Sequence, residues 1–180
     1  MSKLSFHRSA LGLLLLSWTT AALAQQSTNL PGGAGALRET HGDWVVSCSV
    51  QAVAGRDAKT CFLNQQRTDA QTRQRILGIE LRPATAGVEG TLVLPFGLAL
   101  ARGASFQIDD APAGAPIAFR TCLPVGCVVQ IAFEARTVAA LRNGTVLKVA
   151  TVRDGGGDMP LSISLKGFAG ALDRTIALLR

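Results

Sequence analysis

Apolar and polar residues alternate with a period of two over most of the chain beyond residue 40, as in β-strands that bury one face. The apolar positions of the successive runs are Trp44, Val46, Cys48 and Val50; Leu77, Ile79 and Leu81; Leu92, Leu94 and Phe96; Ala104, Phe106 and Ile108; Phe119; Val129, Ile131 and Phe133; Leu147 and Val149; and Leu161, Ile163 and Leu165. Turn sequences rich in Gly, Pro and Asp separate these runs at 54–57, 83–90, 109–116 and 154–158. Eight or nine short strands at about ten-residue spacing predict an all-β fold, an antiparallel β-sandwich rather than a parallel sheet.

Two segments depart from this period and predict helices. Residues 134–143 read as a short helix, which Gly144 ends at the C′ position. The apolar residues that recur at helical spacing toward the C-terminus are Leu165, Phe168, Leu172, Ile176 and Leu179. We expect this last helix to lay its apolar stripe on the sandwich, because core packing explains such a stripe better than a partner-binding face does.

The first 24 residues have the features of a secretory signal peptide. Lys3, His7 and Arg8 precede an apolar run that is too short to span a membrane, and Ala22-Leu23-Ala24 fits a cleavage site. We therefore expect a signal peptide at 1–24, a polar, Gly-rich flexible leader at 25–40 and one domain at 41–180. No transmembrane segment is expected after cleavage, so the sequence predicts a soluble exported protein.

The charge of the chain argues against a nucleic-acid partner. The formal net charge of +6 falls to +4 when Lys3 and Arg8 leave with the signal peptide, because all 12 acidic residues follow it. The arginines are scattered, Tyr is absent and the few aromatic residues are not interleaved with basic ones. A nucleic-acid surface needs a basic stripe with stacking platforms, so we expect none here.

Four cysteines, Cys48, Cys61, Cys122 and Cys127, follow the signal peptide. Four cysteines allow three pairings. The residues favour local pairing, since Pro124 and Gly126 suit a tight turn between the last two cysteines, and the first two border a hairpin-like loop. The spacings fit neither a Cys₄ zinc site nor a C-x-x-C redox motif, so we expect structural disulfides.

The remaining reactive residues form no recognisable catalytic set. His41 is the one histidine beyond the signal peptide, and we expect it to be a solvated side chain at the mobile edge of the first strand. Asp109 and Asp110 are adjacent in a loop, where carboxylates diverge, and Asp154 and Asp158 flank three glycines with no EF-hand spacing. No P-loop, G-x-G-x-x-G or G-x-S-x-G motif is present. We expect no catalytic, cofactor-binding or metal-binding residues.

Several segments together resemble the invasion-associated locus B family of exported proteobacterial proteins. They are Gly42-Asp43-Trp44 with Cys48, Cys61 with Gln65, residues 94–100 (LPFGLAL), residues 119–127 (FRTCLPVGC) and residues 164–168 (SLKGF). The F-x-T-C-x-x-x-G-C element is the most specific of them. The resemblance implies an immunoglobulin-like β-sandwich in the periplasm, supports the two local disulfides and implies no catalytic residue set. The family name comes from a role in host-cell invasion.

Two hypotheses on function follow. The first is a non-enzymatic periplasmic module that uses a sheet edge or loops to bind an envelope protein partner, with no cofactor. The second is an exported redox or hydrolytic enzyme that acts through its cysteines or His41. The sequence identifies neither the partner nor the oligomeric state.

Overall fold

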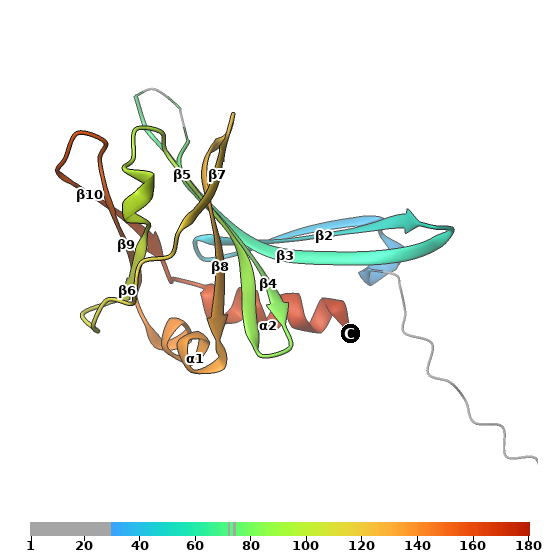
Figure 1. Cartoon of the computed structure of the whole chain (residues 1–180). Helices are drawn as coiled ribbons and strands as arrows, with labels where there is room; N and C mark the ends of the chain where they lie inside the picture. Colours follow the sequence, from blue (N-terminus) through green and yellow to red (C-terminus); the bar gives the residue numbers. More distant parts are fainter. Residues whose placement is uncertain (1–29, 72, 74) are drawn as a thin grey trace, which may run out of the picture.

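The computed structural model describes residues 30–71, 73 and 75–180, so the expected signal peptide and the start of the leader lie outside the described residues. Ten strands and two α-helices occur in this part of the chain (Figure 1). The strands are β1 (Ala36–His41), β2 (Trp44–Val53), β3 (Arg56–Thr68), β4 (Arg75–Ala84), β5 (Gly87–Leu94), β6 (Ser105–Ile108), β7 (Phe119–Leu123), β8 (Gly126–Glu134), β9 (Val146–Val152) and β10 (Asp158–Ser164). The helices are α1 (Ala135–Asn143) and α2 (Phe168–Leu179), and Pro31–Gly33 and Leu100–Arg102 form short 3₁₀ turns.

The strands form two antiparallel sheets. A seven-stranded sheet has the order β1-β2-β3-β4-β5-β8-β7, and a three-stranded sheet has the order β10-β9-β6. The predicted all-β sandwich with a short helix and a C-terminal helix is confirmed. The strand number differs from the expected eight or nine because of β1.

Strand β1 occupies part of the segment that we expected to be a flexible leader. Residues 36–40 of that segment pair with β2, from Ala36 opposite Ser49 to Thr40 opposite Val45. The alternation in this strand contains one large apolar residue, Leu37, so its period is hard to see in the sequence. The ordered domain therefore begins before residue 41.

The inner face of the seven-stranded sheet is covered by different elements at its two ends. Helix α2 contacts β1, β2, β3 and β4, and the predicted apolar stripe faces them, with Phe168 and Leu172 fully buried. Trp44 of β2 meets Phe168 edge to face with the ring centroids 5.2 Å apart. At the other end, α1 contacts β5 and β8, and Phe106 of β6 meets Phe133 of β8 at 5.6 Å. Trp44, Phe133, Phe168 and Leu172 belong to one core, against which the partly buried Phe106 packs.

The backbone of Ser164, at the end of β10, joins the two sheets. Its carbonyl accepts hydrogen bonds from Trp44 Nε1 at 2.9 Å and from Gln65 Nε2 at 3.0 Å. Its N–H donates to Gln65 Oε1 at 3.0 Å, and its side-chain hydroxyl donates to Asp43 at 2.6 Å. Gln65 is buried on the inner face of β3, so its amide satisfies both backbone groups of a residue in the other sheet.

Gly144 ends α1 as predicted, but for a different reason. Its φ is −82°, an extended backbone that any residue adopts, rather than the left-handed conformation typical of a glycine at a helix end. A Cβ at this position would lie 2.8 Å from Ile108 Cγ2. Glycine therefore allows Ile108 of β6 to pack closely against the end of α1.

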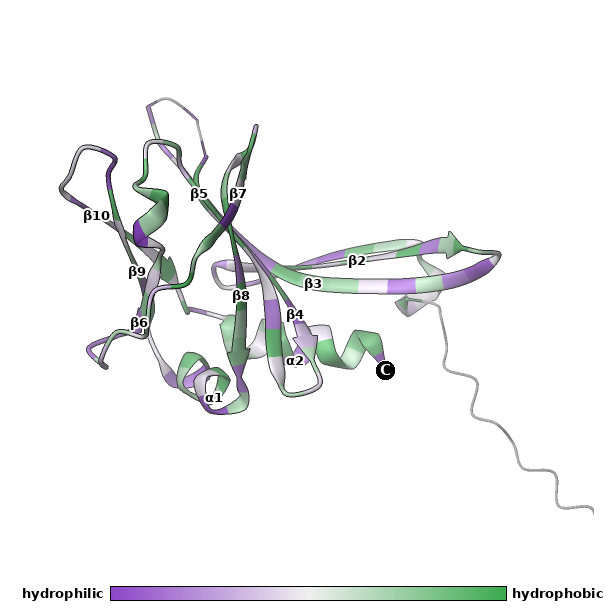
Figure 2. Cartoon of the chain, viewed as in Figure 1, coloured by the Kyte–Doolittle hydropathy of each residue, from purple (hydrophilic) through white to green (hydrophobic). Residues whose placement is uncertain are grey.

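The β2–β3 hairpin extends beyond the rest of the described domain (Figure 1). Residues 51–57 are exposed, and Figure 2 shows hydrophilic residues where β3 starts. This part of the hairpin adds no residue to the core, in contrast to its base, where Trp44, Val46 and Leu63 are buried.

Candidate functional site

Both predicted local disulfides are present in the structure. Cys48 and Cys61 lie directly opposite each other in β2 and β3 with a Cα–Cα distance of 4.1 Å, and Cys122 and Cys127 do so in β7 and β8 at 3.9 Å. We call them the β2–β3 disulfide and the β7–β8 disulfide. The described residues contain no free cysteine, so no thiol nucleophile or thiolate metal ligand remains among them.

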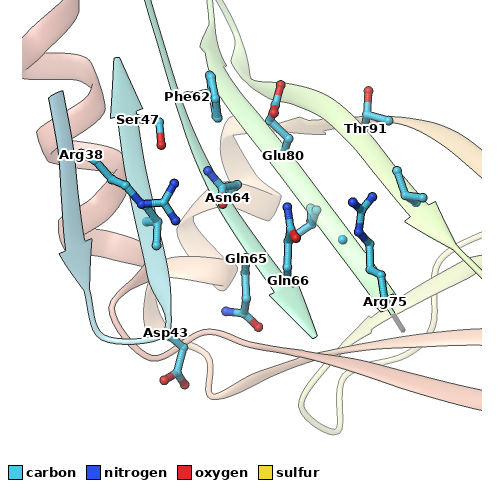
Figure 3. A pocket seen from close by; sticks show the side chains of 14 residues that line it. Arg38, Asp43, Ser47, Phe62, Asn64, Gln65, Gln66, Arg75, Glu80 and Thr91 are labelled. Carbon is cyan, nitrogen blue, oxygen red and sulfur yellow. The ribbon is translucent and has the colours of Figure 1, made fainter. Parts of the chain in front are cut away.

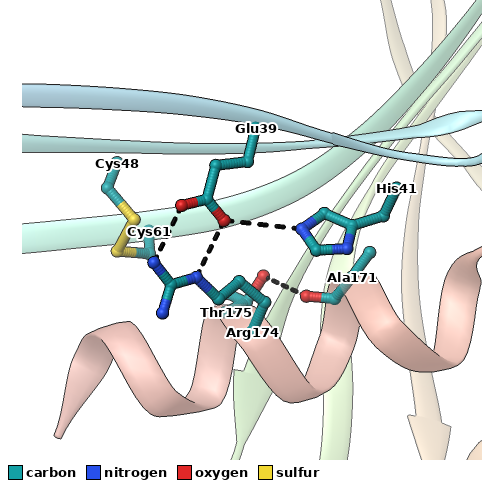
Figure 4. Close-up of a disulfide and its surroundings, with 7 residues drawn as sticks. All are labelled: Glu39, His41, Cys48, Cys61, Ala171, Arg174 and Thr175. Atoms are coloured by element: carbon teal, nitrogen blue, oxygen red, sulfur yellow. Dashed lines mark hydrogen bonds and ion pairs between the residues drawn. A yellow bond between two sulfur atoms is a disulfide. The ribbon is translucent and has the colours of Figure 1, made fainter.

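His41 lies in a charged cluster between β1 and α2 (Figure 4). Arg174 of α2 holds the Glu39 carboxylate with two hydrogen bonds, each 2.8 Å long. His41 Nε2 lies 3.5 Å from the same carboxylate, at the long limit of a hydrogen bond. The hydrogen bond from Arg174 lowers the pKa of Glu39, although desolvation opposes the shift.

The expectation of a solvated His41 at a mobile edge differs from the structure. Its side chain is only 28% exposed, and its ring lies next to Gly170 of α2. The difference arises because β1 is paired along its whole length with β2 and is covered by α2. The Arg174–Glu39 ion pair beside His41 joins α2 to β1, so the cluster stabilises the fold.

The adjacent Asp109 and Asp110 are also held by contacts within the domain. Asp109 accepts hydrogen bonds from the backbone N–H groups of Thr145 and Val146, at 3.1 and 2.9 Å, and Asp110 pairs with Lys148 at 3.0 Å. Within the described ranges, no group of three or more His, Cys, Asp or Glu side chains could hold a metal ion.

A polar hollow lies on the outer face of the seven-stranded sheet, opposite α2. Its volume is about 810 Å³, and Figure 3 shows the side chains that line it. We call it the polar groove, and its main lining residues are Arg38, Asp43, Ser47, Phe62, Asn64, Gln66, Arg75, Glu80 and Thr91, with the buried Gln65 of the inner face at its border. Asn64 and Gln66 stand on this face because they alternate along β3 with the buried Leu63 and Gln65.

The strand register lines up one polar row across the groove. Asn64 is opposite Glu80, Glu80 is opposite Thr91, and Thr91 is opposite Gln130, in the adjacent strands β3, β4, β5 and β8. Gln130 Nε2 donates to Thr91 Oγ1 at 3.3 Å. The row therefore continues the groove into a neighbouring hollow of about 340 Å³, which Glu80, Thr91 and Gln130 also line.

Most charged and amide groups of the groove are not used inside the domain. The side chains of Arg38, Asn64, Gln66, Arg75 and Glu80 make no hydrogen bond or ion pair to another described residue. A polar outer face is normal for an antiparallel sheet. This hollow also contains two guanidinium groups, a carboxylate and two amides that do not pair with one another. It is therefore suited to a polar ligand.

Sequence reasoning did not identify this groove. It included Asp43 and Gln65 in the family resemblance, and it assigned no role to the polar positions of β3 and β4 that line the groove. The polar positions of an alternating run could have indicated the face, but not which of its residues come together, because that depends on the register between strands.

The fold and its surfaces define a disulfide-stapled β-sandwich protein with an open polar face. No helix in the described part of the chain is long and apolar enough to cross a membrane. The family model "Invasion associated locus B (IalB) protein" matches residues 44–175. The chain belongs to the invasion-associated locus B family.

Relatives and a solved structure agree with this assignment. The chain is 45% identical to an invasion protein B homolog of Brucella abortus over 94% of this chain and 96% of that protein. It is 32% identical to invasion protein B of Bartonella bacilliformis over 88% and 84%, respectively. The crystal structure of invasion associated protein B from Bartonella henselae superposes with a TM-score of 0.71 at 36% identity, covering 79% of this chain and 96% of that one. None of these names denotes a reaction.

Proposed function

We propose that this chain is a non-enzymatic, exported periplasmic protein that binds an envelope protein partner through the polar groove. The observation that carries the proposal is the set of five unpaired polar and charged groups in a hollow of about 810 Å³. Each of them can form hydrogen bonds with a partner without first breaking one in the domain, so binding gains more than it loses. Export is supported by the predicted signal peptide at 1–24 and by the two disulfides, which persist in oxidising compartments.

A protein partner fits the chemistry of the groove. Arg38 and Arg75 offer donors for carboxylates and backbone carbonyls, while Asn64 and Gln66 can pair with peptide groups in both directions. The half-buried ring of Phe62 adds an apolar contact among these groups. Because relatives are named invasion proteins, the proposal extends to a role in host interaction.

Photo-cross-linking in intact cells tests the proposal. The photoreactive residue p-benzoylphenylalanine replaces Asn64 in the groove or, as a matched control, the exposed Ala139 on α1. We expect a protein adduct from position 64 that is absent from position 139. Arg75→Glu should remove the adduct, whereas Arg56→Glu at the hairpin tip should leave it. The proposal would be contradicted if the position-64 variant gave no cross-linked adduct, or if both positions gave the same adduct.

A further inference from the structure

A second cleft lies between the two layers of the sandwich, away from the polar groove. Its volume is about 780 Å³, and it is bordered by β6, the loop that follows β6, and α1. Figure 1 shows that loop and α1 side by side at one end of the domain. The inner wall is apolar and consists of Phe106, Ile108, Ile117, Phe133 and Leu147. The cleft shares no lining residue with the polar groove.

The walls of this cleft are held in place by hydrogen bonds. Ala104 and Ile117 exchange two backbone hydrogen bonds of 2.9 and 2.8 Å, and Gly114 N–H donates to Phe106 O at 2.8 Å. The Asp109 carboxylate ties the start of the loop to the backbone of Thr145. Since small-molecule sites are usually preformed and mostly apolar, with volumes of roughly 300–1,000 Å³, the cleft has the properties of a ligand site.

One basic side chain that lines the cleft, Arg136, is left without an acidic partner among the described residues. Asp109 is engaged by backbone N–H groups, and Asp110 is paired with Lys148. Arg136, on the first turn of α1, lines the cleft, and its side chain has no ion pair or hydrogen bond with any other described residue. A guanidinium group that makes no ion pair therefore lines an apolar cleft, and a guanidinium binds a carboxylate with two parallel hydrogen bonds.

We propose that the cleft binds a single-chain carboxylate amphiphile, a fatty acid, with its hydrocarbon tail among Phe106, Ile117 and Phe133 and its carboxylate on Arg136. The apolar wall supplies most of the binding free energy, because affinity from hydrocarbon burial rises with the area removed from water. Arg136 supplies the preference for a negative head group. This site is independent of the polar groove, so the two proposals can fail separately.

Fluorescence titration of the purified exported protein with cis-parinaric acid, a fluorescent fatty acid, tests this inference. The bound fatty acids of the preparation are first removed by extraction. We expect saturable binding of one molecule per chain and displacement by palmitate. Hexadecyltrimethylammonium, which has the same tail length and a positive head, should displace the probe poorly.

Two variants locate the site. Arg136→Gln should raise the Kd by about tenfold or more, as expected for the loss of a charge-assisted pair, whereas Arg56→Gln at the distant hairpin tip should leave the Kd unchanged. Ala140→Trp, on the cleft side of α1, should block the probe while circular dichroism shows that the fold is kept. Absence of saturable binding, or equal Kd values for the wild type and Arg136→Gln, would overturn the inference.

Discussion

Replacement of Gln65 by methionine tests the link between the two sheets. The substitution keeps an unbranched side chain of similar length on β3 but removes both polar atoms that meet Ser164. The Ser164 carbonyl keeps its bond from Trp44, so the main loss is the acceptor of the Ser164 N–H. An orphaned, largely buried donor costs about 1–3 kcal/mol, and the lost second hydrogen bond adds about 1 kcal/mol.

We therefore expect Gln65→Met to lower the free energy of unfolding by about 2–3 kcal/mol, after the gain from burying an apolar side chain. For a domain of this size the Tm should fall by about 4–12 °C. Urea titration followed by far-UV circular dichroism, with the disulfides intact, measures the change. Gln66→Met is the matched control, because Gln66 is exposed on the opposite face of the same strand, and its effect should stay within about 0.5 kcal/mol.

The shared acceptor predicts a further, sharper result. Trp44→Phe removes one donor to the Ser164 carbonyl, and Gln65→Met removes the other. Only the double variant leaves that carbonyl without a hydrogen bond. Its loss of unfolding free energy should therefore exceed the sum of the two single-variant losses by about 1 kcal/mol. Strict additivity, or a Gln65→Met variant as stable as the control, would refute the reasoning.

Three other perturbations are expected to have the following effects. Arg174→Gln should destabilise the protein near neutral pH and have no effect in acid. The lowered pKa of Glu39 gives stability that is present above the ordinary carboxyl pKa of 4.5 and is lost as the pH falls through the folded-state pKa. Thermal unfolding of the wild type and Arg174→Gln at pH 7 and pH 3 measures this, and an equal difference in Tm at both pH values would contradict it. Replacing both cysteines of the β2–β3 disulfide with alanine should lower the free energy of unfolding by about 3 kcal/mol, and the same change in the β7–β8 disulfide should lower it by about 2 kcal/mol. The difference follows from the sequence separations of 13 and 5. Urea titration measures both losses, and the reverse order would contradict the loop-length argument. The Gly167→Ala variant should have a lower urea midpoint than the Gly155→Ala variant. Both glycines have a φ near +90°, but only a Cβ at 167 would clash with the His41 carbonyl. Equal urea midpoints would show that this close approach is unimportant.

The elements that were predictable from sequence are those with a strong local period. The run from Trp44 to Val50 and the stripe through Phe168 and Leu172 were placed correctly because each buries one face over several residues. Phe96 followed the same alternation, yet β5 ends at Leu94 and Phe96 is 59% exposed. The Pro95 that follows β5 has no N–H for a ladder, so the alternation does not continue as a strand.

The polar surfaces were not predictable in the same way. Gln65 stands out in the sequence as a polar residue in a buried register after Cys61 and Leu63, but its partner is 99 residues away. The polar row from Asn64 to Gln130 likewise depends on three strand registers, none of which is visible in the composition of a single strand. Long-range pairing decides which polar side chains meet, and a single sequence does not report it.

The two proposed sites differ in the size of ligand that the layers allow. Helix α2, α1 and the three-stranded sheet occupy the inner face of the seven-stranded sheet, so a large partner cannot bind that face, whereas the outer face with the polar groove is open to it. Between the layers, β6 is only four residues long, and the loop after it leaves a cleft that admits a chain of small cross-section. Because Ser164 holds the layers together on the side away from this cleft, a ligand between β6 and α1 can bind without separating the sheets. A fatty acid and a protein partner could then occupy the same molecule at once, and binding of palmitate should leave the cross-link at position 64 unchanged.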